Sequence, residues 1–587
     1  MLIYNCFSKG ELFVYLKKTK QSNGRIYLSI VDGYYDKEKG HSRTITIEKV
    51  GYLDELEKQY DNPISFFNER VQMLKKEKAE LKSPVSIEFS HDEKLTYNYV
   101  YRKNFGYTVL SQIYHELEID KFFINKQRGS KISFSSNDIM KLLAFSRLLH
   151  PASKKKTFEG RNLYFEKENY SLDNVYRCLS FFHKHSSALQ IWLNDRIKQQ
   201  YGRSTNLVYY DVTNYYFETD ITDDLRKKGV SKEHRPNPIV QMGLFMDNMG
   251  IPITFELFPG NTNDCLTFRP GLSRIQKEYD LGKIIVVADK GMTTGDNIYY
   301  TLSGKNGYVF SMSVRGADKN FKDYVLDENG YEWYGSEYKR KSRLYPRTIR
   351  VTARSGKKLK KVVDEKQVIF YSEKYAKKAK ADRAKTIAKA IDIINSPCKY
   401  SRATSHGAAG YVKNITFDKN TGEILSPEKL LKLDLEKLQA EEALDGYYAI
   451  VTSEYKEPDD HIINIYRGLW RIEESFRVTK SDLEARPVFV SREEHIQAHF
   501  LTCFIALIIA RAIELKLDHK YSIGRILESL ANSECTHMKQ NYYLFDYFDE
   551  VLEDIGSIFK IDFSKRVRSL GEIKKIFAAT KKGKNSL

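Results

Sequence analysis

The sequence predicts an α/β protein with a mixed β-sheet flanked by helices, a β-rich inserted region, and further β and helical regions before the sheet. Between residues 206 and 315, strand-like and helix-like segments follow one another in the order β-β-β-α-β-α-β. Another strand-like run, GYYAIVT at 446–452, comes after a long interruption. The 587 residues suffice for roughly three to five domains of ordinary size.

Composition and periodicity divide the chain into six regions. They are an N-terminal β module and connector helix (1–95), a helical domain (96–204), the first part of the core (205–315), a β-rich basic insertion (316–440), the second part of the core (441–515), and a C-terminal helical region with a basic tail (516–587). Runs at 25–31 and 43–50 predict a hairpin, and 64–82 predicts the connector helix.

The core is predicted from alternating runs. The expected strands are 207–217, 240–246, 251–258, 284–288 and 308–314, and the expected helices are 265–280 and 293–303. Three meandering strands followed by crossovers to parallel strands are the order of a ribonuclease-H-like core.

The chain is basic and poor in cysteine. It has 95 Lys and Arg against 77 Asp and Glu, a formal charge of +18, which favours a polyanionic partner such as nucleic acid. A generically basic cytosolic protein is the alternative. The six cysteines form no CxxC pair, so we expect neither a zinc knuckle nor a disulfide framework.

No membrane segment is expected. The N-terminus lacks the basic-then-apolar layout of a signal peptide, and the longest apolar run, 500–510, is too short to span a bilayer. We therefore expect a cytoplasmic protein.

Basic residues gather in the inserted region. Between 339 and 361 there are 11 basic residues and no acidic one, with Trp333, Tyr338 and Tyr345 interleaved. Such a stretch suits nucleic acid, because cations track phosphates and aromatic rings stack on bases. The alternative is an exposed charged sheet edge that prevents aggregation. A second cluster, 154–156, follows the helix that ends at His150-Pro151, and it either holds nucleic acid or is a solvated run.

Two aspartates lie on predicted strands of the core. Asp211 shares one strand face with Tyr209 and Tyr215, and a carboxylate there is costly to bury unless it is paired or binds metal. The alternative is an edge-strand Asp facing water. Asp289 ends the run IIVVAD, where α/β sheets place their sites, with Asp296 the better candidate for a helix cap.

The segment 466–480, YRGLWRIEESFRVTK, reads as one helix. Tyr466, Glu473 and Lys480 are spaced by seven residues, so they share one stripe, whereas Glu474 lies on a different face from Lys480. The alternative is a surface helix with a polar side.

These motifs resemble the DDE transposases of bacterial insertion sequences. The resemblance rests on DVT at 211–213, the strand ending in Asp289, PGNTND at 259–264, and YRGLWRIEESFRVTK, which is similar to the branch with a Tyr-Arg-Glu-Lys signature. It covers roughly 205–315 and 445–505, and it implies a ribonuclease-H-like core with a β-rich insertion.

The resemblance also implies roles for single residues. Asp211, Asp289 and Glu473 would be the catalytic, metal-binding triad, holding two Mg²⁺ or Mn²⁺ ions, and Tyr466 and Lys480 would contact DNA-end phosphates. Where the branch has its signature Arg, this chain has Leu469. We hypothesise that Arg477, one turn after Glu473, replaces it. The residues expected to bind DNA are Tyr466, Arg467, Arg471, Arg477, Lys480, Trp333, Lys339, Arg340, Lys341 and Arg343.

The expected function is that of an insertion-sequence transposase, which cuts transposon ends and joins them to target DNA. Its expected partners are double-stranded DNA and a second copy of the chain, in a bacterial cytoplasm at the nucleoid. The helical domain would hold a DNA end, and Trp333 would hold a flipped base if excision used a hairpin. The alternatives are a metal-dependent nuclease without strand transfer, a DNA-binding regulator derived from a transposase, and a hydrolase acting on a small substrate.

Overall fold

The computed structural model divides the chain into two compact units, one within residues 1–97 and one within 98–587. The residues described are 13–36, 41–82, 86–88, 90–97, 99–166, 169–233, 235–279, 281–395, 407–413, 416–417, 424–425 and 431–582. The predicted tail beyond Lys582 lies outside them, as do Cys6 and Cys398. The four cysteines that are described are all free thiols.

The first unit is a small antiparallel sheet with helices. Its elements are β1 (Phe13–Lys20), β2 (Ile26–Asp36), β3 (His41–Tyr52), α1 (Leu53–Leu56) and α2 (Pro63–Lys82), with the strands in the order β1-β2-β3. The predicted hairpin is β2 with β3, and the predicted connector helix is α2. Sequence reasoning missed β1, whose three lysines obscure its alternation. Val14, Ile30 and Val71 pack α2 onto the sheet.

The second unit is built on a mixed sheet with nine strands among the described residues, in the order β10-β11-β12-β17-β9-β8-β5-β6-β7. The core strands are β5 (Leu207–Tyr216), β6 (Ile239–Asp247), β7 (Pro252–Pro259), β8 (Ile285–Ala288), β9 (Gly307–Met312) and β17 (Tyr447–Thr452). Strands β5, β8 and β9 run parallel, and β6, β7 and β17 are antiparallel to their neighbours. The predicted strand order is confirmed, and it is consistent with a ribonuclease-H-like core.

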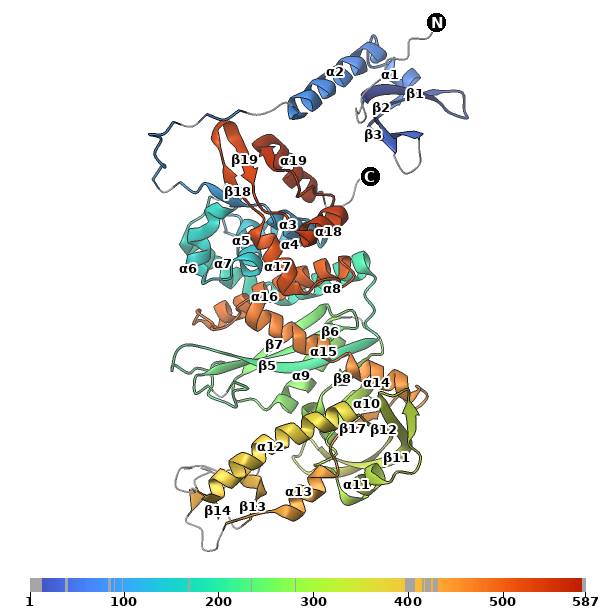
Figure 1. The fold of residues 1–587 in the computed structure, drawn as a ribbon, viewed down its shortest axis with the longest axis vertical. Coiled ribbons are helices and arrows are strands. Elements are labelled where there is room, and N and C mark those ends of the chain that lie inside the picture. Colours follow the sequence, from blue (N-terminus) through green and yellow to red (C-terminus); the bar gives the residue numbers. More distant parts are fainter. Residues whose placement is uncertain are drawn as a thin grey trace. The chain divides into compact units, whose positions relative to one another are not determined.

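Helices cover both faces of this sheet (Figure 1). Helices α9 (Asp264–Glu278) and α10 (Gly295–Ser303) pack on the face that carries Val208, Tyr210 and Val212. Helices α14 (Asp459–Arg467), α15 (Trp470–Arg477) and α16 (Glu493–Lys516) pack on the other face, against Tyr209 and Tyr215. The alternation along β5 therefore directs odd-numbered side chains, Asp211 included, toward α14 and α15.

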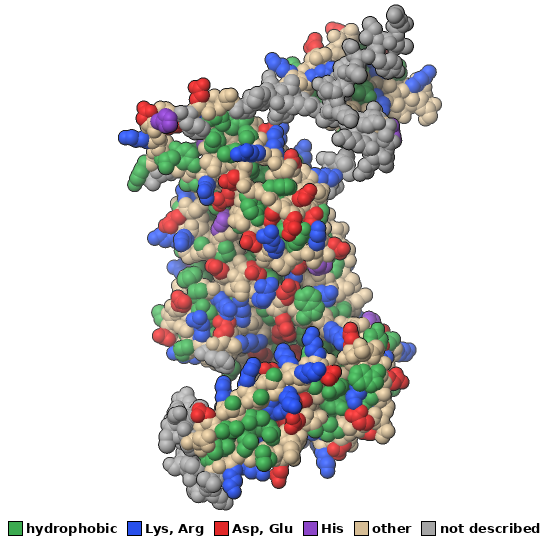
Figure 2. Space-filling model, viewed as in Figure 1, with side chains coloured by type: hydrophobic (Ala, Val, Ile, Leu, Met, Phe, Trp, Pro, Cys, Tyr) green, Lys and Arg blue, Asp and Glu red, His purple; other side chains and the backbone are tan. Residues whose placement is uncertain are grey.

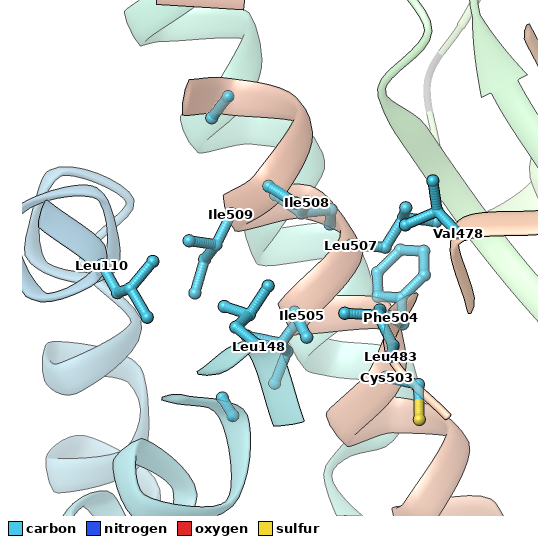
Figure 3. Close-up of a cluster of buried hydrophobic side chains, with 14 of the residues drawn as sticks. Leu110, Leu148, Val478, Leu483, Cys503, Phe504, Ile505, Leu507, Ile508 and Ile509 are labelled. Carbon is cyan, nitrogen blue, oxygen red and sulfur yellow. The ribbon is translucent and has the colours of Figure 1, made fainter. Parts of the chain in front are cut away.

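Helix α16 is the central element of the second unit. It is apolar on every side, which is typical of a helix buried all round. Figure 3 shows it between Leu110 and Leu148 on one side and Val478 and Leu483 on the other. Within the described residues it is the one helix long and apolar enough to cross a membrane, but 94% of its apolar window is buried in the protein. It serves here as a core helix.

The helical region and the C-terminal region form one body around α16. The helices are α3 (Tyr107–Glu116), α4 (Ile119–Gln127), α5 (Ser136–Leu149), α6 (Lys154–Glu159), α7 (Leu172–Lys184) and α8 (Ser186–Tyr201), followed at the other end by α17 (Ile523–Asn532), α18 (Glu550–Phe559) and α19 (Leu570–Thr580). A sheet in the order β20-β19-β18-β4 joins the two: β4 (Arg102–Asn104), β18 (Glu534–His537), β19 (Tyr542–Phe545) and β20 (Val567–Ser569). The predicted C-terminal helical region therefore contains strands β18, β19 and β20 in addition to its helices.

The lysine cluster at 154–156 is divided between the core and the surface. Lys154 is buried at the start of α6, its Nζ 3.3 Å from Nδ1 of His499, and burial lowers its pKa to about 7. Lys155 and Lys156 remain on the surface, where Lys155 faces Glu159 across one helical turn.

The inserted region is mixed rather than β-rich. Strands β10 (Glu332–Tyr334), β11 (Tyr338–Thr352) and β12 (Lys358–Tyr371) extend the central sheet instead of forming a separate one. The 23-residue helix α12 (Glu373–Asn395) was not predicted, although its many alanines and lysines favour a helix. The other elements are α11 (Lys319–Leu326), α13 (Leu435–Glu442) and short strands between 412 and 433.

Charge is mixed over the surface. On the face in Figure 2, Lys and Arg side chains are interspersed with Asp and Glu rather than segregated. The excess of positive charge therefore does not form a single patch on this face.

Candidate active site

Asp211 and Asp289 lie side by side at one edge of the parallel strands. Strands β5 and β8 pair with Tyr209 beside Val287, so Asp211 and Asp289 come two residues further along each strand. Neighbouring strands are about 4.8 Å apart. Tyr209 and Val287 both join the apolar core on the α14–α16 side, and side chains two residues apart share a face. Both carboxylates therefore point toward α14 and α15.

Each aspartate is held through one oxygen. The backbone N–H of Val212 donates to Oδ1 of Asp211 at 2.7 Å. Oδ1 of Asp289 accepts from Ser311 Oγ at 2.8 Å and from the Tyr466 hydroxyl at 3.2 Å. Within the described part of the chain, the Oδ2 atoms have no hydrogen bond or ion pair. Both carboxylates are thus oriented by the protein, each with one oxygen left for a further ligand.

Glu473 faces the two aspartates from α15. Its charge raises the pKa of Asp211 and that of Tyr466, which places its carboxylate near both. The side chain is exposed, and it makes no hydrogen bond or ion pair among the described residues. Glu473 is thus a free carboxylate beside the aspartates.

The predicted single helix over 466–480 is wrong in detail. It is broken at Gly468 into α14 and α15, and a π-helical turn η5 (Val478–Asp482) follows. A Cβ on Gly468 would lie 2.1 Å from the Tyr209 hydroxyl, so glycine allows the junction to approach β5. The same hydroxyl donates to the carbonyl of Ile465 at 3.1 Å. The break therefore docks both helices onto the strand that carries Asp211.

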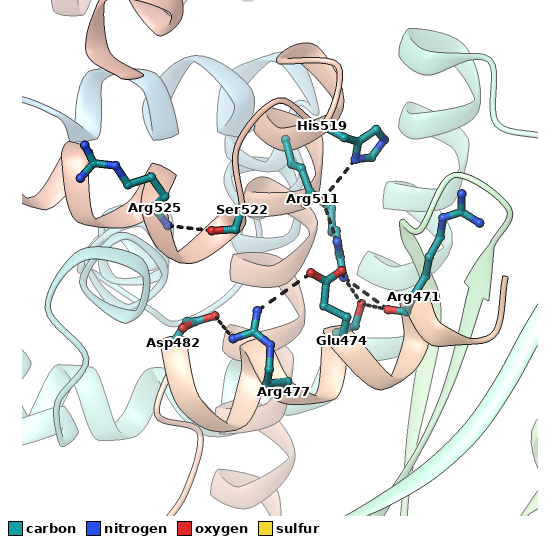
Figure 4. Close-up of polar contacts among 10 residues, drawn as sticks. Arg471, Glu474, Arg477, Asp482, Arg511, His519, Ser522 and Arg525 are labelled. Atoms are coloured by element: carbon teal, nitrogen blue, oxygen red, sulfur yellow. Dashed lines mark hydrogen bonds and ion pairs between the residues drawn. The ribbon is translucent and has the colours of Figure 1, made fainter. Parts of the chain in front are cut away.

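Glu474 has a different environment from its neighbour Glu473. Buried Arg511 of α16 donates to Oε2 of Glu474 at 3.0 Å, and Arg477 lies 3.9 Å from its Oε1 (Figure 4). Arg477 also pairs with Asp482 at 3.4 Å. Glu474 thus anchors α15 to α16 and is already neutralised.

Burial and charge act strongly on Asp211. Burial raises its pKa to about 6, and the charges of Asp289 and Glu473 raise it as well, whereas Lys232 lowers it. Lys232 lies in the segment between β5 and β6, and its Nζ donates to the carbonyl oxygen of Val212. The Lys232 cation therefore lies beside the place where β8 ends at Ala288 while the neighbouring strand β5 continues to Tyr216. This place is called the notch.

Lys480 lies on η5 near the same notch. Its Nζ is 3.5 Å from Glu233 and 5.5 Å from the centre of the Tyr215 ring. Burial and the charge of Lys232 lower its pKa to about 8, while Asp211 opposes the shift. Arg486 also pairs with Glu233. The structure therefore brings Tyr466, Glu473 and Lys480 to the two aspartates.

The three arginines near Leu469 lie in different places. Arg467 lies over the ring of Tyr338 at 4.7 Å, and Arg471 is 5.5 Å from the ring of Trp470. Arg477 was expected to share the face of Glu473, but its guanidinium lies on Glu474 and Asp482, because two acids attract it there (Figure 4). Its proposed phosphate contact stays a prediction.

The predicted DNA-binding residues of the insertion have partners inside the protein, apart from Trp333, which is exposed on β10. Lys339 pairs with Glu328 among three tyrosine rings, and Arg340 pairs with Asp460 at 2.8 Å. Lys341 is buried against the rings of Tyr324 and Tyr331, and Arg343 stacks 3.9 Å from Tyr324 and bonds to Gln367. These four cations stabilise the base of the β11–β12 hairpin, and their DNA contacts stay predictions.

Sequence reasoning missed three residues of this site. Ser311 follows from the register of β8 with β9, since Tyr308 lies beside Val286 and Ser311 therefore beside Asp289. Lys232 and Arg511 carried no local signal, because each reaches the site through a tertiary contact. Thr294, not Asp296, caps α10, and Asp296 instead accepts from Thr352.

The donor set fits a hard divalent cation. Carboxylate oxygens are the ligands that Mg²⁺ and Mn²⁺ prefer, and here two Oδ2 atoms and a whole glutamate are uncommitted. Among the described residues, no three His, Cys, Asp or Glu side chains already converge closely enough to form a metal site. The carboxylates thus share an edge without forming a closed cluster.

Most of the site lies in a region that matches a known protein family. Residues 225–509 match the family model of the transposase DDE domain, a range that begins after Asp211 and includes Asp289 and Glu473. No curated protein matches the chain.

Three solved structures are similar at low scores. The piggyBac transposase synaptic complex with hairpin DNA has 7% identity and a TM-score of 0.35, over 82% of this chain and 85% of that one. The Mos1 transposase paired-end complex with left transposon end has 13% identity and a TM-score of 0.13, over 40% of this chain and 66% of that one. The Mos1 mariner paired-end complex with Mn has 16% identity and a TM-score of 0.12, over 29% of this chain and 56% of that one. The family match includes both the strand that ends in Asp289 and the helix that carries Glu473, so residues 225–509 are similar to a transposase DDE domain, and the chain is an enzyme.

Proposed function

We propose that the protein is an insertion-sequence transposase that cuts the ends of its element and joins them to target DNA, with Asp211, Asp289 and Glu473 as catalytic carboxylates. One observation carries the proposal. Three carboxylates lie at one edge of the core with oxygens that no described residue contacts by a hydrogen bond or ion pair, and two of them fall in the DDE-domain match.

The three carboxylates would hold two Mg²⁺ or Mn²⁺ ions. When bound, such ions stabilise the attacking and leaving oxygens of an in-line phosphoryl transfer. The exposed, unpaired Glu473 and the raised pKa of Asp211 support this role, because both acids gain when a cation neutralises them.

Residues of the chain itself would orient the carboxylates and supply positive charge beside them. Ser311 and Tyr466 fix Asp289 through one oxygen and leave the other toward the site. Lys232 and Lys480 supply positive charge beside Asp211, where a DNA phosphate would enter. Arg511 holds α15 through Glu474, so Glu473 on the same helix keeps its place.

The proposed partners are double-stranded DNA, as two element ends and a target, and a second copy of this chain. The proposed setting is the bacterial cytoplasm at the nucleoid. These parts rest on the resemblance to insertion-sequence transposases.

A cleavage and joining assay tests the proposal. The DNA that flanks the gene is labelled and incubated with Mg²⁺ and wild type, Glu473→Gln or Glu474→Gln. Wild type should release a defined end and join it to a target, and Glu473→Gln should bind the end but lose at least about 10³-fold in rate, since it removes a ligand of the reacting centre. Glu474→Gln is the matched control, and it should retain most of the cleavage.

Other outcomes point to other functions. Release of ends without joining would indicate a nuclease, and binding without cleavage by wild type would indicate a regulator. Equal loss in both glutamine variants would mean that Glu474, or helix stability, carries the effect.

A further inference from the structure

The β11–β12 hairpin extends beyond its neighbours as a two-stranded ribbon. Strand β10 pairs only with Tyr338–Arg340 of β11, and β17 pairs only with Lys366–Tyr371 of β12. Among the described strands, the part between has no further partner. Its end, Ile349–Lys361, is called the ribbon tip below, and its turn closes with the Ala353 N–H donating to Lys357 O at 2.9 Å.

One face of the ribbon tip is fixed to the catalytic core. Ile349 and Val351 pack in the same apolar cluster as Ile298 of α10. Asp296, in the first turn of α10, accepts from the Thr352 N–H at 2.6 Å and from its hydroxyl at 2.9 Å. Because α10 begins six residues after Asp289 in the chain, the ribbon tip is held by the element that follows the active-site strand.

Exposed cations lie around the rest of the ribbon tip: Arg354 and Lys357 are in its turn, and Lys361 lies opposite Ile349. Arg350 and Lys360 lie directly opposite each other across the strands, on the face away from Ile349 and Val351. Arg350, Arg354, Lys357, Lys360 and Lys361 are all exposed and make no hydrogen bond or ion pair among the described residues. Lys358 differs from these cations, because it pairs with Thr352 and Asp296.

This arrangement is unfavourable for the isolated protein. Like charges directly opposite in a strand pair destabilise it, and five free cations within 12 residues repel one another. The cations at the hairpin base, between Lys339 and Arg343, form ion pairs with acidic side chains or stack on tyrosine rings. The five cations at the tip have no such contact among the described residues. A polyanion would relieve them, and a two-stranded ribbon has the width that enters a DNA groove.

We propose that the ribbon tip binds the DNA backbone on the α10 side of the catalytic core, while the base of the hairpin is structural. The contact is to phosphates, so it adds affinity without sequence preference. This inference rests on the proposed function, since it assigns a place to DNA on the same enzyme.

The test compares two triple variants of the full chain. The tip variant carries Arg350→Gln, Lys357→Gln and Lys360→Gln. The control carries Lys184→Gln, Lys198→Gln and Lys277→Gln, which remove the same charge from exposed helical positions in α7, α8 and α9. Binding of a duplex is measured over a range of salt concentrations, with the melting temperature of each protein.

The tip variant should lose affinity by about 10- to 100-fold near 0.1 M salt, and its slope of log K against log salt should fall by about two to three, because each lost phosphate contact removes about 0.9. The control should stay close to wild type. Melting of the tip variant should be unchanged or higher, since a repulsive pair is removed.

Equal slopes for the two variants would overturn the inference, even if wild type binds and cuts element ends. If wild type binds duplex but never cuts, the proposed function fails, and the slopes still decide on the ribbon tip. If wild type binds no DNA, both are wrong.

Discussion

The two sides of helix α15 differ in how their charges are neutralised. On the side facing α16, Glu474 meets Arg511, which also bonds to Glu514 at 2.7 Å, so buried charges are matched within the protein. On the side facing β5 and β8, Asp211, Asp289 and Glu473 have oxygens with no partner in the described part of the chain. The two glutamates are adjacent in sequence, yet one serves the fold and the other is free.

This difference shows where stability and reactivity are placed. The side of α15 that faces α16, called the matched side, fixes the helix through ion pairs. The side that faces β5 and β8, called the unmatched side, holds carboxylates that repel one another. The fold tolerates this repulsion only if other contacts hold the carboxylates in place. The apolar helix α16 and the Tyr209 contact at the helix break supply that support. Changes on the matched side should therefore cost stability, and neutralisation on the unmatched side should add it.

The largest effect is expected for Arg511→Met. It removes the buried cation that Glu474 and Glu514 share, and breaking a buried ion pair this way costs about 3–5 kcal/mol. Chemical denaturation at pH 7.5 should show this loss, and DNA cleavage should fall because α15 also carries Glu473.

A matched comparison separates charge from packing. Arg511→Met combined with Glu474→Gln and Glu514→Gln should recover much of the lost stability, since no buried acid is then left unpaired. If the combined variant is less stable than Arg511→Met alone, the charge balance behind α15 is not what holds the helix.

A smaller, opposite effect is expected for Asp211→Asn. Because the folded pKa, about 6, is above the ordinary 3.8, ionisation of this group disfavours folding. The penalty is fully present above pH 6 and absent below pH 3.8. At pH 7.5 without metal, the variant should gain roughly 1–2 kcal/mol in free energy of unfolding, less than the full shift implies because Asp211 is only half-buried.

Metal and pH dependence check this result. The gain should vanish toward pH 3.5, and Mg²⁺ should stabilise wild type more than Asp211→Asn. A variant that is less stable than wild type at pH 7.5 without metal would contradict an unfavourable ionised carboxylate at this half-buried position.

The comparison also shows what sequence could predict. The strands of the core and the positions of Asp211 and Asp289 follow from local alternation, because a buried strand has a period of two. The preference for Glu473 over Glu474 came from helix geometry, although the helix is broken at Gly468. The break depends on Tyr209, 259 residues away in the chain, so no local pattern announces it.

Elsewhere, long-range contacts override local composition. Basic residues at 339–343 read as a free surface, but Glu328, Asp460 and tyrosines from other elements surround them. The local sequence offered a solvated run as one interpretation of Lys154, yet this residue is buried beside His499. A charged side chain needs a partner of opposite charge or water, but only the fold determines whether that partner lies inside the protein.

The smallest effect is expected from the pH dependence of Lys480. Its pKa of about 8 means that its charge is nearly complete at pH 7 and is lost between about pH 7 and 9. If it contacts a phosphate that restores the proton, duplex binding should weaken by roughly fourfold at pH 8.5 relative to pH 7 through this group alone. Lys480→Arg should remove this part of the pH dependence, because arginine stays charged.

Lys232 sharpens the same measurement. Its charge lowers the pKa of Lys480, so Lys232→Ala should move the midpoint of the pH dependence upward while Lys480 itself is intact. A surface control, Lys277→Ala on α9, should leave the midpoint where it is. If Lys232→Ala and Lys277→Ala give the same midpoint as wild type, the two lysines do not share the charge environment of the notch beside Asp211, and DNA would have to meet the unmatched side of α15 through other cations.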